Sequence, residues 1–75
     1  MHWELIKLRK IHGISQEKMA DILGISPTTY SHKENGRYDF KLNEIFVIAN
    51  IFNKRIDEIF LSNNIRKTNI LKEGA

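Results

Sequence analysis

The chain has 75 residues, of which 28% are charged and 41% apolar, a composition typical of one small globular domain. The absence of cysteine excludes disulfides and thiolate metal sites, and it favours a reducing compartment, so we expect a cytoplasmic protein. No apolar run approaches the length of a membrane span, and the start lacks the apolar centre of a signal peptide.

The net charge of +3 favours an anionic partner, and this charge is unevenly distributed. Residues 1–12 and 62–75 each carry three basic residues against one acidic residue, whereas residues 13–61 carry six against seven. Within that middle part, Lys33, Arg37 and Lys41 form a basic cluster. We expect one domain over residues 1–61 and a loosely ordered polar tail over residues 62–75, with one helical turn near Ile70.

The first two expected helices are Trp3–His12 and Gln16–Leu23. Gly13 ends the first helix in the usual position of a C-terminal glycine, and Ser15 is placed to cap the second. The apolar periodicity directs five side chains into the core: Leu5, Leu8, Met19, Ala20 and Leu23.

A third helix, Pro27–Glu34, is expected after a turn of only three residues. Gly24 stops the second helix and permits the left-handed backbone of the turn, while Ile25 is expected to pack into the core. Ser26 is placed to cap the third helix, and Pro27 suits its first position. So short a turn makes the two helices cross steeply, which is the helix-turn-helix arrangement and presents the third helix outward.

Asn35 and Gly36 end the third helix, and Arg37–Lys41 is expected to be a loop. A fourth helix follows, with apolar residues at helical spacing: Leu42, Ile45, Ile48, Ala49 and Phe52. After a break over residues 53–55, a short fifth helix is indicated by Ile56, Ile59 and Phe60. Because no strand pattern is present, we predict an all-α fold, a compact bundle of five helices.

The segment SQEKMADILGISPTTYSHKENGR resembles the helix-turn-helix of the Cro/C1-type (XRE) repressor family. The matching features are Ser15-Gln16, Ala20, Leu23-Gly24-Ile25-Ser26 and Glu34-Asn35-Gly36. The stretches LRKIHG and LNEIFVIANIFNKRIDEIF resemble the family's first and last two helices. The resemblance implies a bundle of the lambda-repressor-like DNA-binding type, with helices 2 and 3 as the helix-turn-helix. The mix of residues, including YDFKLNEIF, also resembles small regulators of phages and mobile elements in low-GC bacteria.

The resemblance further implies that the third helix lies in the DNA major groove. The residues expected to contact bases are Pro27, Thr28, Ser31 and His32. Thr28 can bond a base edge or place its methyl group on a thymine methyl, and His32 can bond guanine or a phosphate. Because Thr and Ser are short, discrimination also rests on DNA shape and bridging water. The alternative is that these are solvated side chains without a ligand.

A second set is expected to contact the DNA backbone: Gln16, Ser26, Thr29, Lys33, Asn35, Arg37, Tyr38 and Lys41. In the family, the position of Gln16 bonds a phosphate with help from the helix N-terminal amides. Lys33 departs from the family, which commonly has an aliphatic residue there. Either its ammonium extends past the core to a phosphate, or the local packing differs.

Other positions carry structural expectations. Arg9 and Glu34 match an ion pair of the family, which would link the first helix to the third. Tyr30 is expected in the core with its hydroxyl near the surface. Arg55 stands where the family often has a capping serine, which leaves the start of the fifth helix open.

Apolar residues at expected surface positions are Trp3, Ile6, Ile11, Val47, Ile51 and Leu61. Ile51 and Leu61 lie near the last helices, where the family usually dimerises. We therefore expect a homodimer through helices 4 and 5, bound to a near-palindromic operator and repressing by occlusion.

The alternative function is a protein-interaction module, an antirepressor or antitoxin-like subunit that uses the same fold. No enzyme is expected, because the three histidines lack ligand spacing and no catalytic set is evident. We expect no metal, no cofactor, no small-molecule ligand and no membrane association.

Overall fold

In the computed structural model, which describes residues 1–60, all regular structure is helical. The helices are α1 (Trp3–Ile11), α2 (Gln16–Leu23), α3 (Pro27–Glu34), α4 (Leu42–Phe52) and α5 (Ile56–Phe60). The predicted all-α bundle of five helices is confirmed over these residues. The one shift is at the end of α1, where His12 is the capping residue. The expected helical turn near Ile70 lies outside the described residues.

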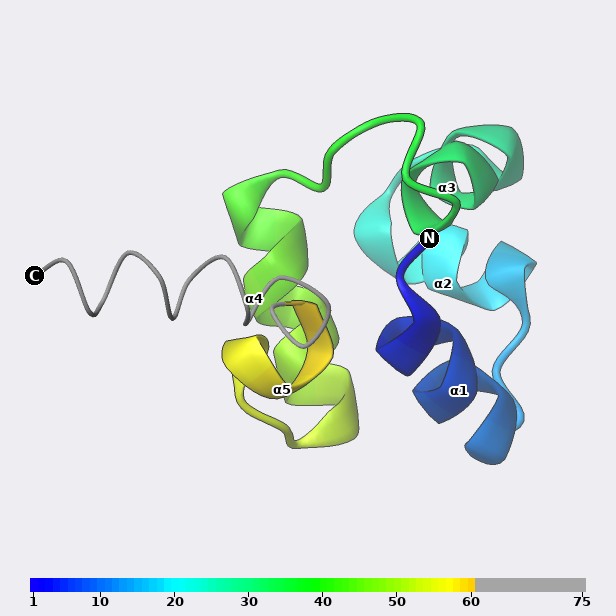
Figure 1. Ribbon diagram of the computed structural model, residues 1–75. Helices are drawn as coiled ribbons and strands as arrows, with labels where there is room; N and C mark the ends of the chain where they lie inside the picture. Colours follow the sequence, from blue (N-terminus) through cyan, green and yellow to red (C-terminus); the bar gives the residue numbers. More distant parts are fainter. Residues whose placement is uncertain (61–75) are drawn as a thin grey trace, which may run out of the picture.

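Figure 1 shows α1, α2 and α3 on one side of the molecule and α4 and α5 on the other. The loop that follows α3 crosses from one side to the other at the end of the molecule opposite α5. The N-terminal residues run beneath α3, where the His2 amide donates a 3.0 Å hydrogen bond to the carbonyl of Glu34. The C-terminal end of α3 is therefore held by the chain's first residues as well as by its own helix.

The two predicted serine caps are confirmed. The Ser15 hydroxyl accepts a 3.0 Å bond from the Lys18 amide at the start of α2. The Ser26 hydroxyl accepts a 3.1 Å bond from the Thr29 amide at the start of α3. Each cap satisfies an amide that has no partner inside its helix, which is why both helices begin where the sequence indicates.

The turn between α2 and α3 has the predicted left-handed residue. Gly24 has φ of +73°, and the Ile25 amide returns to the carbonyl of Ala20 at 3.0 Å. This bond closes the end of α2 in a Schellman arrangement and lets α3 begin three residues later. At the end of α3, Gly36 is left-handed as well, whereas Asn35 keeps a right-handed backbone.

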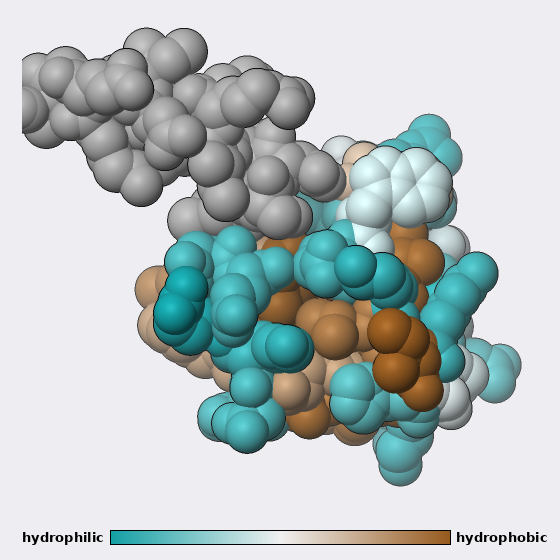
Figure 2. Space-filling view, turned by 60° about the horizontal axis from the view of Figure 1, so that its bottom comes forward, coloured by the Kyte–Doolittle hydropathy of each residue, from teal (hydrophilic) through white to brown (hydrophobic). Residues whose placement is uncertain are grey.

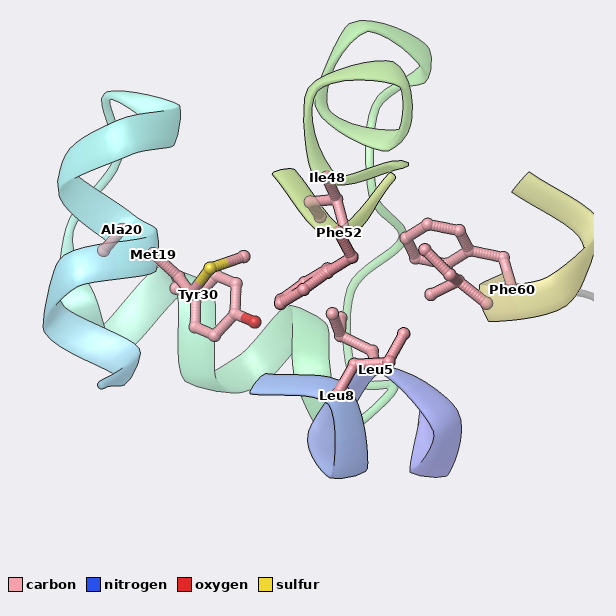
Figure 3. Close-up of a cluster of buried hydrophobic side chains, with 9 residues drawn as sticks. Leu5, Leu8, Met19, Ala20, Tyr30, Ile48, Phe52 and Phe60 are labelled. Atoms are coloured by element: carbon pink, nitrogen blue, oxygen red, sulfur yellow. The ribbon is translucent and has the colours of Figure 1, made fainter. Parts of the chain in front are cut away.

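Side chains from all five helices meet in the core (Figure 3). The buried apolar residues are Leu5, Leu8, Met19, Ala20, Tyr30, Ile48, Phe52, Ile59 and Phe60. Ile25 packs against them, as predicted. Only one of these side chains, Tyr30, comes from α3. The third helix is therefore attached to the core by very little apolar surface.

The loop after α3 is anchored by an aromatic residue that the sequence analysis did not single out. The Phe40 ring lies 6.0 Å from the ring of Tyr30, 5.5 Å from that of Phe60 and 5.3 Å from that of His2, measured between centroids. Edge-to-face contacts at such distances are favourable for aromatic rings. Phe40 thus holds residues 37–41 against α3 and α5.

The surface predictions for apolar residues hold in part. Trp3, Ile11 and Val47 are exposed, whereas Ile6 and Ile51 are half-buried, and Leu61 lies outside the described residues. Figure 2 turns the end of the molecule with α1 and α5 toward the viewer, and apolar surface gathers there inside a hydrophilic rim. On α4, the apolar spacing predicts an inward Leu42, but Leu42 is 66% exposed and Phe46 is 52% exposed.

Candidate nucleic-acid interface

The four predicted base-contacting residues share one face of α3. Pro27 and Thr28 are exposed at its start, and Ser31 and His32 are half-exposed one turn later. Residues four apart lie above one another on a helix, so Pro27 and Ser31 form one row and Thr28 and His32 another. The turn at Gly24 leaves Pro27 and Thr28 exposed, whereas the Tyr38 ring lies against His32.

The predicted backbone-contacting residues surround this face. Five are exposed: Ser26, Asn35, Arg37, Tyr38 and Lys41. Gln16 and Thr29 are half-buried, and the Thr29 hydroxyl accepts a 2.8 Å bond from that of Ser26. Within residues 1–60, neither the Arg37 guanidinium nor the Lys41 ammonium pairs with a carboxylate. Their charges are therefore available to an anion.

Tyr38 connects the two groups of residues. Its ring meets the His32 ring edge-on, with 5.4 Å between the centroids. The Arg37 amide, one residue earlier, bonds the His32 carbonyl at 2.8 Å. The first part of the loop is therefore fixed to the last turn of α3, a contact that the sequence analysis did not predict.

The structure contradicts the prediction that Lys33 reaches a phosphate. Its ammonium lies 2.7 Å and 2.9 Å from the two carboxylate oxygens of Glu44, and both residues are buried. Reaching outward would leave the Glu44 carboxylate buried without its cation, which is strongly unfavourable. The other alternative left by the sequence, a local difference in packing, is the one observed.

The expected pair between Arg9 and Glu34 is confirmed, and it belongs to a larger network. The Glu34 carboxylate accepts bonds from Arg9 Nε at 2.8 Å, Gln16 Nε2 at 2.8 Å and the Tyr30 hydroxyl at 2.7 Å. The prediction that the Tyr30 hydroxyl lies near the surface is wrong, because it is buried against Glu34. The network joins α1, α2 and α3 and orients the Gln16 amide at the start of α2.

The two buried carboxylates remain ionised. Burial raises the pKa of Glu34, but hydrogen bonds from Arg9, Gln16 and Tyr30 outweigh burial and lower the pKa below its usual value. Burial likewise raises the pKa of Glu44, and the bonds from Lys33 and the Lys41 amide lower it overall. Burial and the bond to Glu34 raise the pKa of Tyr30, which keeps its hydroxyl a donor.

Residues 1–60 contain no group of three or more histidine, aspartate or glutamate side chains arranged to hold a metal ion. Among the described helices, none has both the length and the apolar character needed to cross a bilayer.

Comparison with known proteins agrees with this geometry. A family profile described as Helix-turn-helix matches residues 5–59. An uncharacterized HTH-type transcriptional regulator of Methanocaldococcus jannaschii is 40% identical over 53 residues, covering 71% of this chain and 80% of that protein. Two uncharacterized HTH-type transcriptional regulators of Archaeoglobus fulgidus are 31% and 30% identical, each over 81% of this chain and 87% and 86% of theirs. No solved structure matches the chain significantly.

The chain belongs to the helix-turn-helix family of Cro/C1-type regulators. In this helix-turn-helix protein, α2 and α3 are the two helices for which the family is named. The likeness to phage and mobile-element regulators stays a prediction, since the relatives above come from other organisms.

Sequence reasoning missed one residue that organises the candidate interface of this helix-turn-helix protein. The Glu44 carboxylate bonds both the Lys33 ammonium and the Lys41 amide, the latter at 2.8 Å. A glutamate three residues after an N-cap is a recognised capping signal, so the bond to Lys41 was open to prediction. The bond to Lys33 carried no sequence signal, because Lys33 lies eleven residues away across a loop.

Proposed function

We propose that this protein binds double-stranded DNA at specific sequences, in the cytoplasm, and represses transcription by occupying an operator. The observation that carries the proposal is the uncovered face of α3, where Pro27 and Thr28 project from a helix held outward by the turn at Gly24. A major groove admits one α-helix, and short polar side chains at the start of that helix reach the base edges.

The backbone contacts follow from the charges beside that face. Among residues 1–60, neither Arg37 nor Lys41 forms a salt bridge with a carboxylate, and both follow α3 in the loop. Phosphate contacts set the register of a protein on the duplex and supply most of its affinity. Gln16 and Tyr38 add polar contacts at the two ends of the helix-turn-helix. Lys33 has no part in this set, because Glu44 holds its ammonium.

We further propose that the protein acts as a homodimer through α4 and α5. The exposed side chains of α4 are all uncharged: Leu42, Asn43, Phe46, Val47 and Asn50. A two-fold axis brings identical faces together, so an uncharged face avoids the repulsion that like charges would cause. Two copies would set their α3 helices about one DNA turn apart, roughly 34 Å, on a near-palindromic site.

Repression by occlusion is the simplest outcome of such binding. Bound over a promoter, a dimer of this size excludes other proteins from the same grooves without any further domain.

The test begins with selection of bound duplexes from random-sequence DNA, followed by anisotropy titrations at several salt concentrations. Affinity should fall steeply as salt rises, because each neutralised phosphate releases counterions. Thr28→Ala and His32→Ala should each weaken binding to the selected duplex by about 10- to 100-fold and leave a scrambled duplex nearly unaffected. His12→Ala, at the C-terminal cap of α1, is the matched control and should change neither affinity.

Two results would overturn the proposal. Equal losses on both duplexes would remove base reading by α3. No salt-dependent binding to any duplex would favour the protein-interaction module instead.

Dimerisation is tested separately by sedimentation at micromolar concentration. Phe46→Glu should yield monomers. A wild type that stays monomeric in the presence of operator would exclude the dimer.

A further inference from the structure

The C-terminal end of α3 carries two consecutive charged residues, Lys33 and Glu34, and both are buried. They pair with different helices: Glu34 bonds Arg9 on α1, and Lys33 bonds Glu44 on α4. Burying an ion pair removes both charges from water, and the attraction between them often does no more than offset that cost. The Lys33–Glu44 pair is therefore poorly explained by stability alone.

The pair fixes the position of α3 relative to α4. Tyr30 is the only buried apolar side chain that this helix contributes, and apolar contact has no preferred direction. The Lys33 ammonium, by contrast, is held by both Glu44 oxygens, at 2.7 Å and 2.9 Å, with Lys33 6% exposed and Glu44 3% exposed. Two short charge-assisted bonds fix both the distance and the direction between α3 and α4.

The same carboxylate also fixes the end of the loop. Glu44 Oε1 accepts the amide of Lys41, the last loop residue, at 2.8 Å. One carboxylate thus joins α3, the loop end and α4. The loop between them carries Arg37 and Lys41, the two cations that the proposed function directs at phosphates.

We propose that Lys33 and Glu44 are positioning residues for DNA binding, which set the spacing between the exposed face of α3 and the loop over residues 37–41. The proposal rests on the proposed function. Phosphates and base edges of a duplex have a fixed relative geometry, so α3 and the loop engage together only if their own spacing is held in advance.

The decisive variant removes both charges at once, Lys33→Met with Glu44→Leu. Replacing a buried ion pair by apolar side chains of similar size is commonly tolerated, so this variant should stay helical. Because Glu44→Leu also removes the acceptor of the Lys41 amide, its thermal midpoint should fall only slightly. Its affinity for the selected duplex should fall by about tenfold to a hundredfold. The slope of log affinity against log salt should become less steep by about one to two, because fewer phosphates are contacted at once.

The pair Glu4–Lys7 on α1, 3.2 Å apart, supplies the matched control, with Lys7 exposed and Glu4 half-buried. Lys7→Met with Glu4→Leu also removes one positive and one negative charge, so the net charge stays the same, as it does in the Lys33/Glu44 variant. This control should bind the duplex with the affinity and salt slope of the wild type.

Glu44→Gln separates positioning from a direct phosphate contact by Lys33. Positioning predicts weaker binding even though the protein becomes more positive, whereas a Lys33 ammonium released toward the backbone predicts tighter binding. If Glu44→Gln does not fold, the double variant still decides the matter. A folded double variant with the affinity and salt slope of the wild type overturns positioning alone. A wild type without salt-dependent DNA binding overturns the proposed function, and positioning with it.

Discussion

Replacing Glu34 with glutamine should remove a large part of the stability of this protein. The carboxylate accepts bonds from Arg9 Nε at 2.8 Å, Arg9 Nη2 at 3.3 Å, Gln16 at 2.8 Å and the Tyr30 hydroxyl at 2.7 Å, and it is 1% exposed. Glutamine keeps the volume but removes the charge, so the Arg9 guanidinium stays buried without a counterion. Breaking a buried pair in this way costs about 3–5 kcal/mol.

That cost is large relative to the total. At about 0.05–0.15 kcal/mol per residue, a chain of 75 residues is stable by roughly 4–11 kcal/mol. Glu34→Gln should therefore unfold at a much lower urea concentration. Tyr30→Phe removes one of the four bonds and leaves the charge paired, so it should cost about 1.5–3 kcal/mol. Gln16→Ala, at a half-buried site, should cost about 1 kcal/mol.

Urea unfolding followed by far-ultraviolet circular dichroism measures this series, provided that the slope against urea stays constant. Arg9→Met with Glu34→Leu is the control, because it leaves neither charge unpaired. It should recover part of the loss caused by Glu34→Gln, since the buried Tyr30 hydroxyl still loses its acceptor. The reasoning is refuted if Glu34→Gln costs less than about 1 kcal/mol, or if Tyr30→Phe costs as much as Glu34→Gln, since the charge would then not dominate the network.

Three smaller predictions can be tested by the same urea assay: the effect of low pH, of a substitution at Gly24 and of a substitution at Ser15. Burial raises the pKa of Glu34 and Glu44, but hydrogen bonds lower it overall, so their stabilisation is complete at neutral pH, declines below about pH 4.3 and is lost below the lowered values. An equal urea midpoint at pH 7 and pH 3 would contradict this sign. Gly24→Ala places a side chain at φ +73° with no atom within 4 Å of it, so backbone strain alone should cost about 1–2 kcal/mol, and Gly24→Asn less. Ser15→Ala removes the acceptor of the Lys18 amide and should cost about 1 kcal/mol; no loss would show that water replaces the cap.

Features that depend on neighbouring residues could be predicted from the sequence. The caps at Ser15 and Ser26, the left-handed Gly24 and the first position of Pro27 are each determined within a few residues, and each is observed. The apolar periodicity located the helices for the same reason, because one face of a helix must be covered. Local chemistry thus accounts for the placement of α3.

Features that depend on where the loop runs could not be predicted. The Lys33 ammonium has a partner only because the chain between α3 and α4 brings Glu44 beside it. The path of that chain depends in turn on the contact between the Phe40 and Tyr30 rings. The buried Tyr30 hydroxyl similarly depends on a glutamate shared with two other helices. Pairs of polar groups distant in sequence leave no periodic signal, and the Arg9–Glu34 pair was predictable only because the family resemblance implied it.

The polar anchors of α3 follow from what the helix must leave uncovered. A surface helix usually buries an apolar stripe, as α2 does with Met19 and Ala20. A helix of eight residues that keeps one face open for a ligand has room for little more than Tyr30. The buried charges at the C-terminal end of α3, Lys33 and Glu34, attach the helix through directional bonds. They do so without covering more of the helix surface. Exposed residues such as Thr28 make no core contact, so their replacement should change ligand preference while leaving the attachment of the helix intact.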